Sequence, residues 1–321
     1  MMSTMEKPKI VICGSIAIDQ IMNFSGKYKD YIKPEMLHVL SISILLDNKA
    51  VNYGGVGANI CYTLALLGEN PILLGSVGSD TSYYLKRLQS MGIDISHIHK
   101  SEEPTACFTV FTDSDDNQIG GFFAGAMSDG GSLSFNDWKG QKIFAVISPH
   151  DPFAMSRQVE ECKKNKMRLF YDIGQQVVNV PAEDLIAGIH AAELLILNDY
   201  EFATLCERTG RTAEEIKKLV PVVVVTKGKG GSTISGKKVE KPIEVPAAKP
   251  ANIVDPTGAG DAFRAGFLFG YVRELDLATC GKIGSVASVY AIENHGTQEF
   301  SFTKTDFAKR YQENFNERLS L

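Results

Sequence analysis

The sequence predicts an α/β protein in which a mostly parallel central sheet lies between layers of helices, with a small second sheet over one end. Short apolar runs alternate with amphipathic segments of helical spacing, which is typical of doubly wound sheets. Two segments, 16–46 and 105–124, break this alternation with strand-like runs that have no helix between them. The length of 321 residues suits one large α/β domain or two average domains.

The expected elements follow this alternation along the chain. Lys9–Cys13 is a short apolar run and is expected to form the first strand. Apolar residues spaced three and four apart, followed by Gly68, indicate a helix over Ala58–Leu67. Thr81–Met91 is also expected to be helical and to end at Gly92. Further strands are expected at Ile72–Val77, Ile143–Ile147, Met167–Tyr171, Leu194–Leu197 and Val222–Thr226, and largely helical structure from Gly258 onward.

The segments without helices are expected to form the second sheet. Thr105–Thr112 and Gln118–Phe123 flank a polar turn, which predicts a β-hairpin. Such strands do not easily join the parallel sheet, because parallel neighbours need long crossover connections. We therefore expect a single domain over residues 1–321, with a lid formed by about 15–54 and 104–126 and an α/β core formed by the remainder.

The composition excludes several classes of function. The chain has 33 Lys and Arg against 38 Asp and Glu, a net charge of −5, so it lacks the basic excess of a nucleic-acid-binding protein. It contains no apolar run of about 18 residues, the length that spans a membrane. The six cysteines form no C-x-x-C pair, which favours buried thiols in a reducing, cytoplasmic compartment.

The strongest chemical signal is Asp255-Pro256-Thr257-Gly258-Ala259-Gly260-Asp261, which runs into an apolar helix. Its two glycines permit a tight turn and leave N–H groups uncovered at a helix N-terminus, where anions bind. Asp261 would lie beside a bound phosphate, where its carboxylate can accept a proton from an attacking hydroxyl. The structural alternative is an aspartate that only caps the helix after a flexible loop.

Three shorter motifs also carry possible ligand chemistry. Gly54-Gly55-Val56-Gly57-Ala58-Asn59 opens a helix, and Asn59 offers both a donor and an acceptor. Thr226-Lys227-Gly228-Lys229-Gly230-Gly231 follows a strand, at the end where open α/β sheets bind ligands. Asn198 and Glu201 follow another strand at a helix start. Each also has a plain interpretation as a turn or helix cap, and none is a dinucleotide fingerprint or a Walker A loop.

In their order along the chain, from Gly54–Asn59 through Asn198–Glu201 and Thr226–Gly231 to Asp255–Asp261, the four motifs resemble those of the ribokinase-like (PfkB) family of carbohydrate and nucleoside kinases, over nearly the whole chain. The resemblance implies a ribokinase-like three-layer fold and transfer of the γ-phosphoryl group of ATP to a primary hydroxyl, assisted by Mg²⁺. It implies that Asp261 is the catalytic base and that Gly258, Ala259 and Gly260 form the anion hole. It assigns the metal to Glu201, and the nucleotide to Asn198, Thr226, Gly228, Gly231, Asp255, Thr257 and Gly296. A requirement for a monovalent cation such as K⁺ stays open.

In finer detail the sequence is similar to the bacterial adenosine kinases, through Gly14–Asp19, Leu37–Ser43, Gly125–Ser128, Gln175-Gln176, Asn198–Glu201 and Asp261–Phe267. This likeness implies that the ribose hydroxyls are bound by Asp19, Gly55 and Asn59. It implies that the nucleoside pocket is lined by Ser15, Ser43, Gln175 and Gln176. It also implies that the purine lies between two rings of the lid, Phe108 and Phe122. Stacking on an aromatic ring contributes about 1–3 kcal/mol per base, which free ribose does not gain. Glutamine amides also match the donor and acceptor edge of adenine.

The expected function is therefore ATP-dependent phosphorylation of the 5′-hydroxyl of adenosine, giving AMP and ADP for purine salvage. A ribokinase or fructokinase is the alternative within the family, because a carboxylate such as Asp19 also binds the diol of a free sugar. A non-catalytic nucleoside-binding protein is the alternative of another class. Because a small sheet has exposed edges, we also expect a homodimer joined through the lid, with no nucleic-acid or membrane partner.

Overall fold

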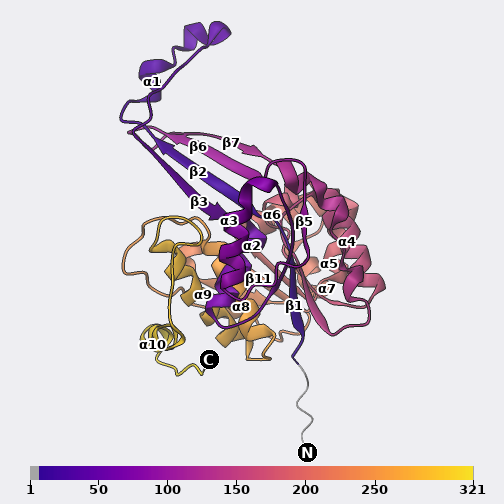
Figure 1. Cartoon of the computed structure of the whole chain (residues 1–321). Coiled ribbons are helices and arrows are strands. Elements are labelled where there is room, and N and C mark those ends of the chain that lie inside the picture. Colours follow the sequence, from indigo (N-terminus) through magenta and orange to yellow (C-terminus); the bar gives the residue numbers. More distant parts are fainter. Residues whose placement is uncertain (1–6, 321) are drawn as a thin grey trace, which may run out of the picture.

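The structure, a computed structural model that describes residues 7–320, is built on a nine-stranded sheet (Figure 1). The strand order is β13-β12-β11-β10-β9-β8-β1-β4-β5. From β11 to β5 all neighbouring strands are parallel, and β12 and β13 add an antiparallel edge. The strands are β1 (Lys9–Cys13), β4 (Ile72–Val77), β5 (Ile98–Lys100), β8 (Ile143–Ile147), β9 (Arg168–Tyr171), β10 (Leu194–Asn198), β11 (Val222–Thr226), β12 (Ser232–Ser235) and β13 (Ile243–Val245).

Helices cover both faces of this sheet and enclose two apolar cores. One core lies under α2 (Val56–Leu66), α3 (Ser82–Ser90), α8 (Ala259–Tyr271), α9 (Leu277–Ile292) and α10 (Lys304–Phe315). The other lies under α4 (Pro152–Lys164), α5 (Ala182–Ala191), α6 (Asp199–Thr209) and α7 (Ala213–Leu219). Strand β8 is buried throughout because alternate side chains enter the two cores, Phe144 and Val146 in one and Ala145 in the other. The three layers confirm the predicted fold class.

Short 3₁₀ turns occupy several of the connections. They are η2 (Ser79–Thr81), η3 (Gly125–Ser132), η4 (Phe135–Trp138), η5 (Gly174–Val178) and η6 (Gly228–Gly230). Within residues 7–320, no helix combines the length and the apolar character needed to cross a membrane.

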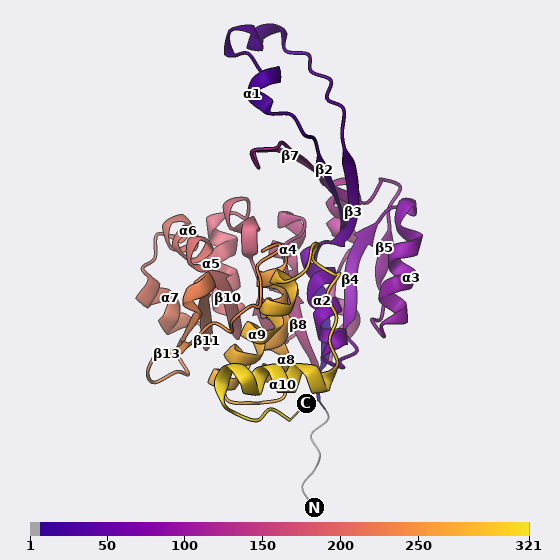
Figure 2. The same cartoon turned by 90° about the vertical axis from the view of Figure 1, so that its left-hand side faces the viewer.

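The second sheet projects from the core as a separate layer (Figure 2). It has the order β3-β2-β6-β7, with β2 (Ala17–Asn23), β3 (Asn48–Gly54), β6 (Ala106–Thr112) and β7 (Gln118–Phe123). Strands β2 and β6 are parallel, and the other two pairs are antiparallel. We call this sheet the lid. Its root lies where Ala17, Gly54 and Ala106 leave the core, because these residues are buried.

An arm of residues 24–47 extends beyond the far end of the lid (Figures 1 and 2). It contains α1 (Tyr28–Tyr31) and η1 (Pro34–Val39). The prediction of strands throughout 16–46 is therefore wrong beyond Asn23. Pro34 opens a 3₁₀ turn, since its fixed φ and missing N–H disfavour a paired strand, and Leu37 and Val39 stay exposed, so burial does not stabilise one.

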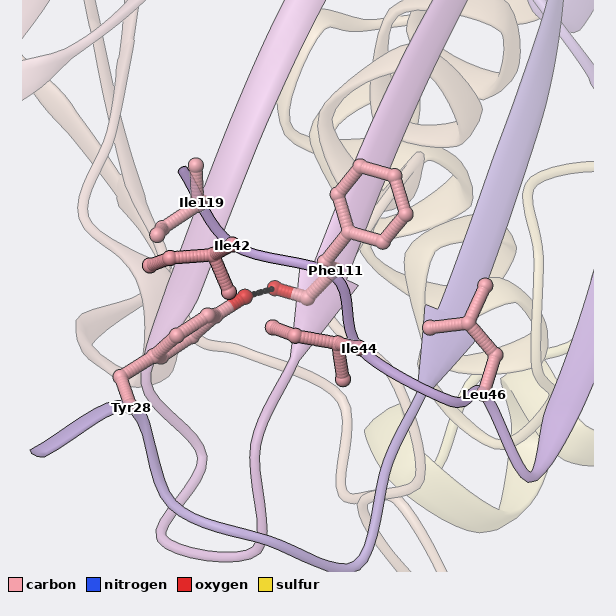
Figure 3. Close-up of a pocket in the computed structure, with 6 residues that line it drawn as sticks. All are labelled: Tyr28, Ile42, Ile44, Leu46, Phe111 and Ile119. Atoms are coloured by element: carbon pink, nitrogen blue, oxygen red, sulfur yellow. Dashed lines mark hydrogen bonds between the residues drawn. The ribbon is translucent and has the colours of Figure 1, made fainter. Parts of the chain in front are cut away.

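The arm folds back on the lid at one apolar pocket of about 230 Å³ (Figure 3). Its lining residues are Tyr28, Ile42, Ile44, Leu46, Phe111 and Ile119. The Tyr28 hydroxyl donates to the Phe111 carbonyl at 2.7 Å, which fixes the base of the arm against β6. This pocket lies at the far end of the lid, because Phe111 pairs with Met22 near the end of β2.

Candidate active site

The predicted site residues gather at the carboxyl ends of the parallel strands, below the root of the lid. Ser15 lies just after β1, Asn198 and Thr226 end β10 and β11, and Asp261 lies in the first turn of α8. Asn198 and Thr226 are direct neighbours in the sheet register. Ligands of open α/β sheets bind at this edge, because the loops and helix N-termini converge there.

The glycine turn before α8 has the geometry that the sequence predicts. Gly258 has a left-handed φ of 79°, and a Cβ there would lie 2.9 Å from the Thr297 side chain, so only glycine fits. The turn leads directly into the first helical residues, Ala259 and Gly260, whose N–H groups have no partner inside the helix; the Ala259 N–H donates to the Pro256 carbonyl of the turn at 3.3 Å. Gly260 is exposed. A helix N-terminus of this kind can hold a phosphate.

Asp255 ties this turn to the loop that follows α9. Its carboxylate accepts hydrogen bonds from the backbone N–H of Thr257 at 2.9 Å and of Gly296 at 3.1 Å. Burial opposes ionisation of Asp255, but these hydrogen bonds outweigh it and lower the pKa of the carboxyl group. Asp255, Thr257 and Gly296 therefore lie together, as the sequence predicts for the nucleotide side of the site.

Asp261 is largely buried beside the turn, with 14% of its side chain exposed. The Asn59 amide donates to its Oδ2 at 2.8 Å, and the Arg264 guanidinium lies 3.7 Å from its Oδ1. Burial raises the pKa of Asp261 and the nearby Glu201 charge adds to this, while Arg264 and Asn59 oppose it. A carboxylate whose pKa is raised accepts a proton more readily, which suits a general base.

Asn59 is fixed by its own buried partners. Its Oδ1 accepts hydrogen bonds from Thr297 Oγ1 and Gln298 Nε2, both at 2.9 Å, so its amide nitrogen points to Asp261. Gln298 also donates to the Tyr84 hydroxyl at 2.5 Å, and Tyr84 donates to the Gly54 carbonyl at 2.9 Å. The residue predicted to bind ribose therefore also orients the predicted base. The sequence reasoning missed Tyr84, Thr297 and Gln298, which lie outside the motifs.

Three of the residues predicted to bind the acceptor lie in one row across the lid. Asp19 pairs with Asn52 on one side and with Phe108 on the other, and Phe108 pairs with Phe122. Paired residues of adjacent strands share a face of the sheet. Burial, then the charges of Asp261 and Asp255, raise the pKa of Asp19 to about 6. The row therefore places a carboxylate and two aromatic rings on one face.

The second glycine motif makes room for this row. A Cβ on Gly54 would lie 2.5 Å from Asp19 Oδ2, so the missing side chain admits the carboxylate. Gly55 has a φ of 93°, and a Cβ there would lie 2.5 Å from the Ser15 carbonyl. Ser15 Oγ accepts a hydrogen bond from the Val56 N–H at 3.0 Å. This bond provides a partner for one of the free N–H groups at the start of α2.

The remaining predicted pocket residues are spread more widely. Gln176 is buried, and its amide donates to the His150 carbonyl and accepts from Asn179, both at 2.7 Å. Gln175 is exposed. Ser43 lies on the arm, beyond the Asn23–Asn48 pair at the far end of the lid, so the structure does not bring it to Ser15.

The nucleotide side adds a helix cap and a glycine loop. Asn198 and Glu201 form a capping box, in which each side chain accepts the backbone N–H of the other at 2.7 and 3.0 Å. Gly228 and Gly231 have φ values of 53° and 79° in the loop after β11. Glu201 and Asn198 supply carboxylate and amide oxygens, ligands that suit Mg²⁺ held mainly by phosphate and water. Residues 7–320 contain no group of three His, Cys, Asp or Glu that could hold a metal ion by itself.

A buried ion-pair cluster under the site also escaped the sequence reasoning. Arg264 Nε donates to Asp172 Oδ1 at 2.6 Å, and Ser148 Oγ donates to Asp172 Oδ2 at 3.0 Å. Burial raises the pKa of Asp172 to about 7, even though Arg264 favours its ionised form. Two signals were present in the sequence: an arginine in an apolar helix three residues after Asp261, and an aspartate directly after a predicted strand.

This fold and site define a class of enzyme, the phosphotransferases that use an alcohol group as acceptor. The model of the pfkB family of carbohydrate kinases matches residues 9–304, and the chain belongs to that family. The family and the enzyme class expected from the sequence motifs are thereby confirmed.

Among the similar proteins are nucleoside kinases that match nearly the whole chain. A nucleoside kinase of Methanocaldococcus jannaschii is 32% identical over 293 residues, which cover 90% of this chain and 92% of that protein. The structure of Burkholderia thailandensis nucleoside kinase in complex with inosine matches with a TM-score of 0.85 at 30% identity, over 96% of this chain and 99% of that one. The same enzyme in complex with ADP-inosine matches with a TM-score of 0.82 at 31% identity, over 96% and 97%.

Proposed function

We propose that this protein is a nucleoside kinase that transfers the γ-phosphoryl group of ATP to the 5′-hydroxyl of adenosine, giving AMP and ADP. The observation that carries the proposal is the row Asp19, Phe108 and Phe122 on one face of the lid. A nucleoside has a diol for the carboxylate and a base for the rings, whereas a free sugar has only the diol. The nucleoside kinases among the similar proteins support the same acceptor class.

The phosphoryl donor would bind on the opposite side of Asp261. ATP phosphates would meet the N–H groups of Gly258–Gly260 and the loop of Thr226, Gly228 and Gly231. Mg²⁺, bound through Glu201, Asn198 and water, would neutralise charge on the phosphates. Asp261, oriented by Asn59 at 2.8 Å, would accept the proton of the 5′-hydroxyl as it attacks. Closure of the lid would exclude water that would otherwise hydrolyse ATP.

The base would be recognised mainly by stacking. Phe108 and Phe122 are 38% and 54% exposed, so both rings are available to a ligand. The Gln176 amide already has a protein partner at each of its two ends, whereas the amide of the neighbouring Gln175 is exposed and available to the base. Because stacking tolerates every purine, we expect the protein to phosphorylate inosine in addition to adenosine.

The test is an acceptor panel with ATP and Mg²⁺. Adenosine, inosine, ribose and fructose are supplied at equal concentration, and ADP release and the phosphorylated product are measured. We expect turnover with adenosine to exceed turnover with ribose and fructose by at least about tenfold, the size of one stacking contact. Preference for ribose or fructose would instead assign the chain to the sugar kinases of its family. Absence of ADP release with every acceptor would favour a nucleoside-binding protein without catalysis.

We also propose a homodimer joined through the lid. Strand β7 is an exposed edge, and its side chains Ile119 and Phe123 are each about half exposed. The arm adds further exposed apolar side chains, of which Leu45 is 89% exposed. Unpaired edges and apolar patches of this kind favour association. Light scattering at micromolar concentration should give twice the 35.1 kDa chain mass, and a monomer would contradict the proposal.

A further inference from the structure

Arg264 is a buried cation in a helix that is otherwise apolar around it. It lies in α8 three residues after Asp261, and its neighbours from Ala262 to Gly270 are alanine, phenylalanine, leucine and glycine. Only 11% of its side chain is exposed. A charged side chain is rarely buried unless specific partners compensate for the loss of water, so its partners indicate its role.

The guanidinium of Arg264 lies between three carboxylates, and a different nitrogen faces each one. Nε is 2.6 Å from Asp172, Nη2 is 3.3 Å from Glu201, and Nη1 is 3.7 Å from Asp261. Asp172 is fully buried and also accepts a hydrogen bond from Ser148. Asp172 is therefore the fixed anchor, and Arg264 in turn links the predicted metal-side carboxylate to the predicted base.

The same guanidinium lies beneath the glycine turn. A Cβ added to Gly260 would lie 2.8 Å from Arg264 Nη1, which places the cation directly against the backbone of the predicted anion hole. Five carboxylates surround this region: Asp172, Glu201 and Asp261 contact Arg264, and Asp19 interacts electrostatically with both Asp255 and Asp261. Without a fixed cation, this cluster would repel the phosphates of a nucleotide.

We propose that Arg264, anchored by Asp172, is a positioning residue for the phosphoryl transfer. Its guanidinium holds Asp261 and Glu201 at a set separation and supplies positive charge under the Gly258–Gly260 turn, where charge moves during transfer. The proposal rests on the phosphate site of the proposed function and does not depend on which acceptor is used. A fork of fixed donors is required, because lysine would supply the charge without the geometry.

The test compares kcat, KM and Tm for Arg264→Gln, Arg264→Lys and Asp172→Asn, with the best acceptor of the panel. We expect Arg264→Gln to lower kcat by about 10²-fold, with the KM of the acceptor changed by less than about threefold. The kcat of Arg264→Lys should be about tenfold higher than that of Arg264→Gln, because lysine keeps the positive charge. Asp172→Asn should lower kcat by about tenfold, because Arg264 loses its charged anchor.

The matched control is Arg168→Gln. Arg168 begins β9, the strand that ends just before Asp172, and it forms two hydrogen bonds to Glu193 at 2.9 and 2.7 Å. Its loss should lower Tm and leave kcat unchanged. If Arg264 had a purely structural role, all three test variants would also show a lower Tm with kcat unchanged. This result would overturn the inference.

The outcomes also separate this inference from the proposed function. If the wild-type protein phosphorylates none of the acceptors, the proposed function fails. If the wild type is active and Arg264→Gln keeps its kcat, the inference alone fails. Should Arg264→Gln not fold, Arg264→Lys and Asp172→Asn decide, and unchanged kcat in both would overturn it.

Discussion

The core and the lid are each built on a β-sheet, yet they differ in how completely the strands of that sheet are covered. In the core, β1 and β8 are buried on both faces, and the charged cluster below the site is held by Asp172, which is fully buried. In the lid, every residue of β7 is exposed, and the arm beyond it has few buried side chains. A small sheet that buries so little surface is the part of a protein that opens most easily.

This difference divides the chemistry between the two regions. The predicted base and anion hole belong to the core, where the contacts of Asp261 with Asn59 and Arg264 and the close packing of Gly258 on Thr297 fix their geometry. The predicted acceptor row Asp19, Phe108 and Phe122 belongs to the lid, where exposure of the two rings leaves their surface free for a ligand. The two regions join at Asn59, whose partners Thr297 and Gln298 also reach the root of β3 through the Tyr53 carbonyl and Tyr84.

The largest expected effect tests the core. Asp261→Asn removes the predicted base but keeps the shape of the side chain, so kcat should fall by about 10²–10⁴-fold while both substrates still bind. Steady-state kinetics and calorimetric titration with nucleoside measure the two parts separately. Near-normal turnover in this variant would show that Asp261 is not the base.

The next effect tests the lid. Phe108→Ala removes one stacking surface, so the KM for adenosine should rise by about tenfold or more, whereas Tm should change little because the ring is 38% exposed. Phe123→Ala is the matched control, because Phe123 pairs with Cys107 and lies on the opposite face of the same sheet. Equal KM values for the two variants would count against a stacked purine.

A smaller effect tests the junction between the regions. Gln298→Leu removes one of the two donors to Asn59 Oδ1 and the donor to the Tyr84 hydroxyl, so two buried hydrogen bonds are lost. We expect the free energy of unfolding to fall by about 1–3 kcal/mol. Chemical denaturation measures this loss. The variant should also lower kcat, since Thr297 alone then holds the Asn59 amide toward Asp261. Lower stability with kcat unaffected would show that Asn59 needs no such support.

The smallest effect is a pH dependence in the lid. Because burial and nearby carboxylates raise the pKa of Asp19 to about 6, its carboxyl group takes up a proton as the pH falls through that value. The protonated form loses the charge that accepts the ribose diol, so the KM of the acceptor should rise by about fourfold between pH 7.5 and pH 5.5. Asp19→Asn should have a higher KM that no longer changes over this range. A wild-type KM independent of pH would exclude this role.

The apolar runs in the sequence were sufficient to predict most strands of the core sheet. The strands Lys9–Cys13, Ile72–Val77, Ile143–Ile147 and Val222–Thr226 have the predicted bounds, because a continuous apolar run between polar turns has few other stable conformations. The short β12–β13 edge was not predicted, since Ser232–Ser235 lacks such a run. The strands predicted for residues 24–46 failed because apolar character there is not matched by burial.

The sequence by itself determined the succession of strands and motifs along the chain. Because each motif directly follows a strand or begins a helix, this succession also indicated the edge of the sheet where the glycine turns and Asp261 would meet. What only the tertiary structure decided is which distant side chains touch. Asp172 meets Arg264 across 92 residues, Asn59 meets Gln298 across 239, and the register of β2 on β6 places Asp19 beside Phe108. Periodicity along a chain reports burial, whereas pairing between segments depends on how two buried surfaces pack together.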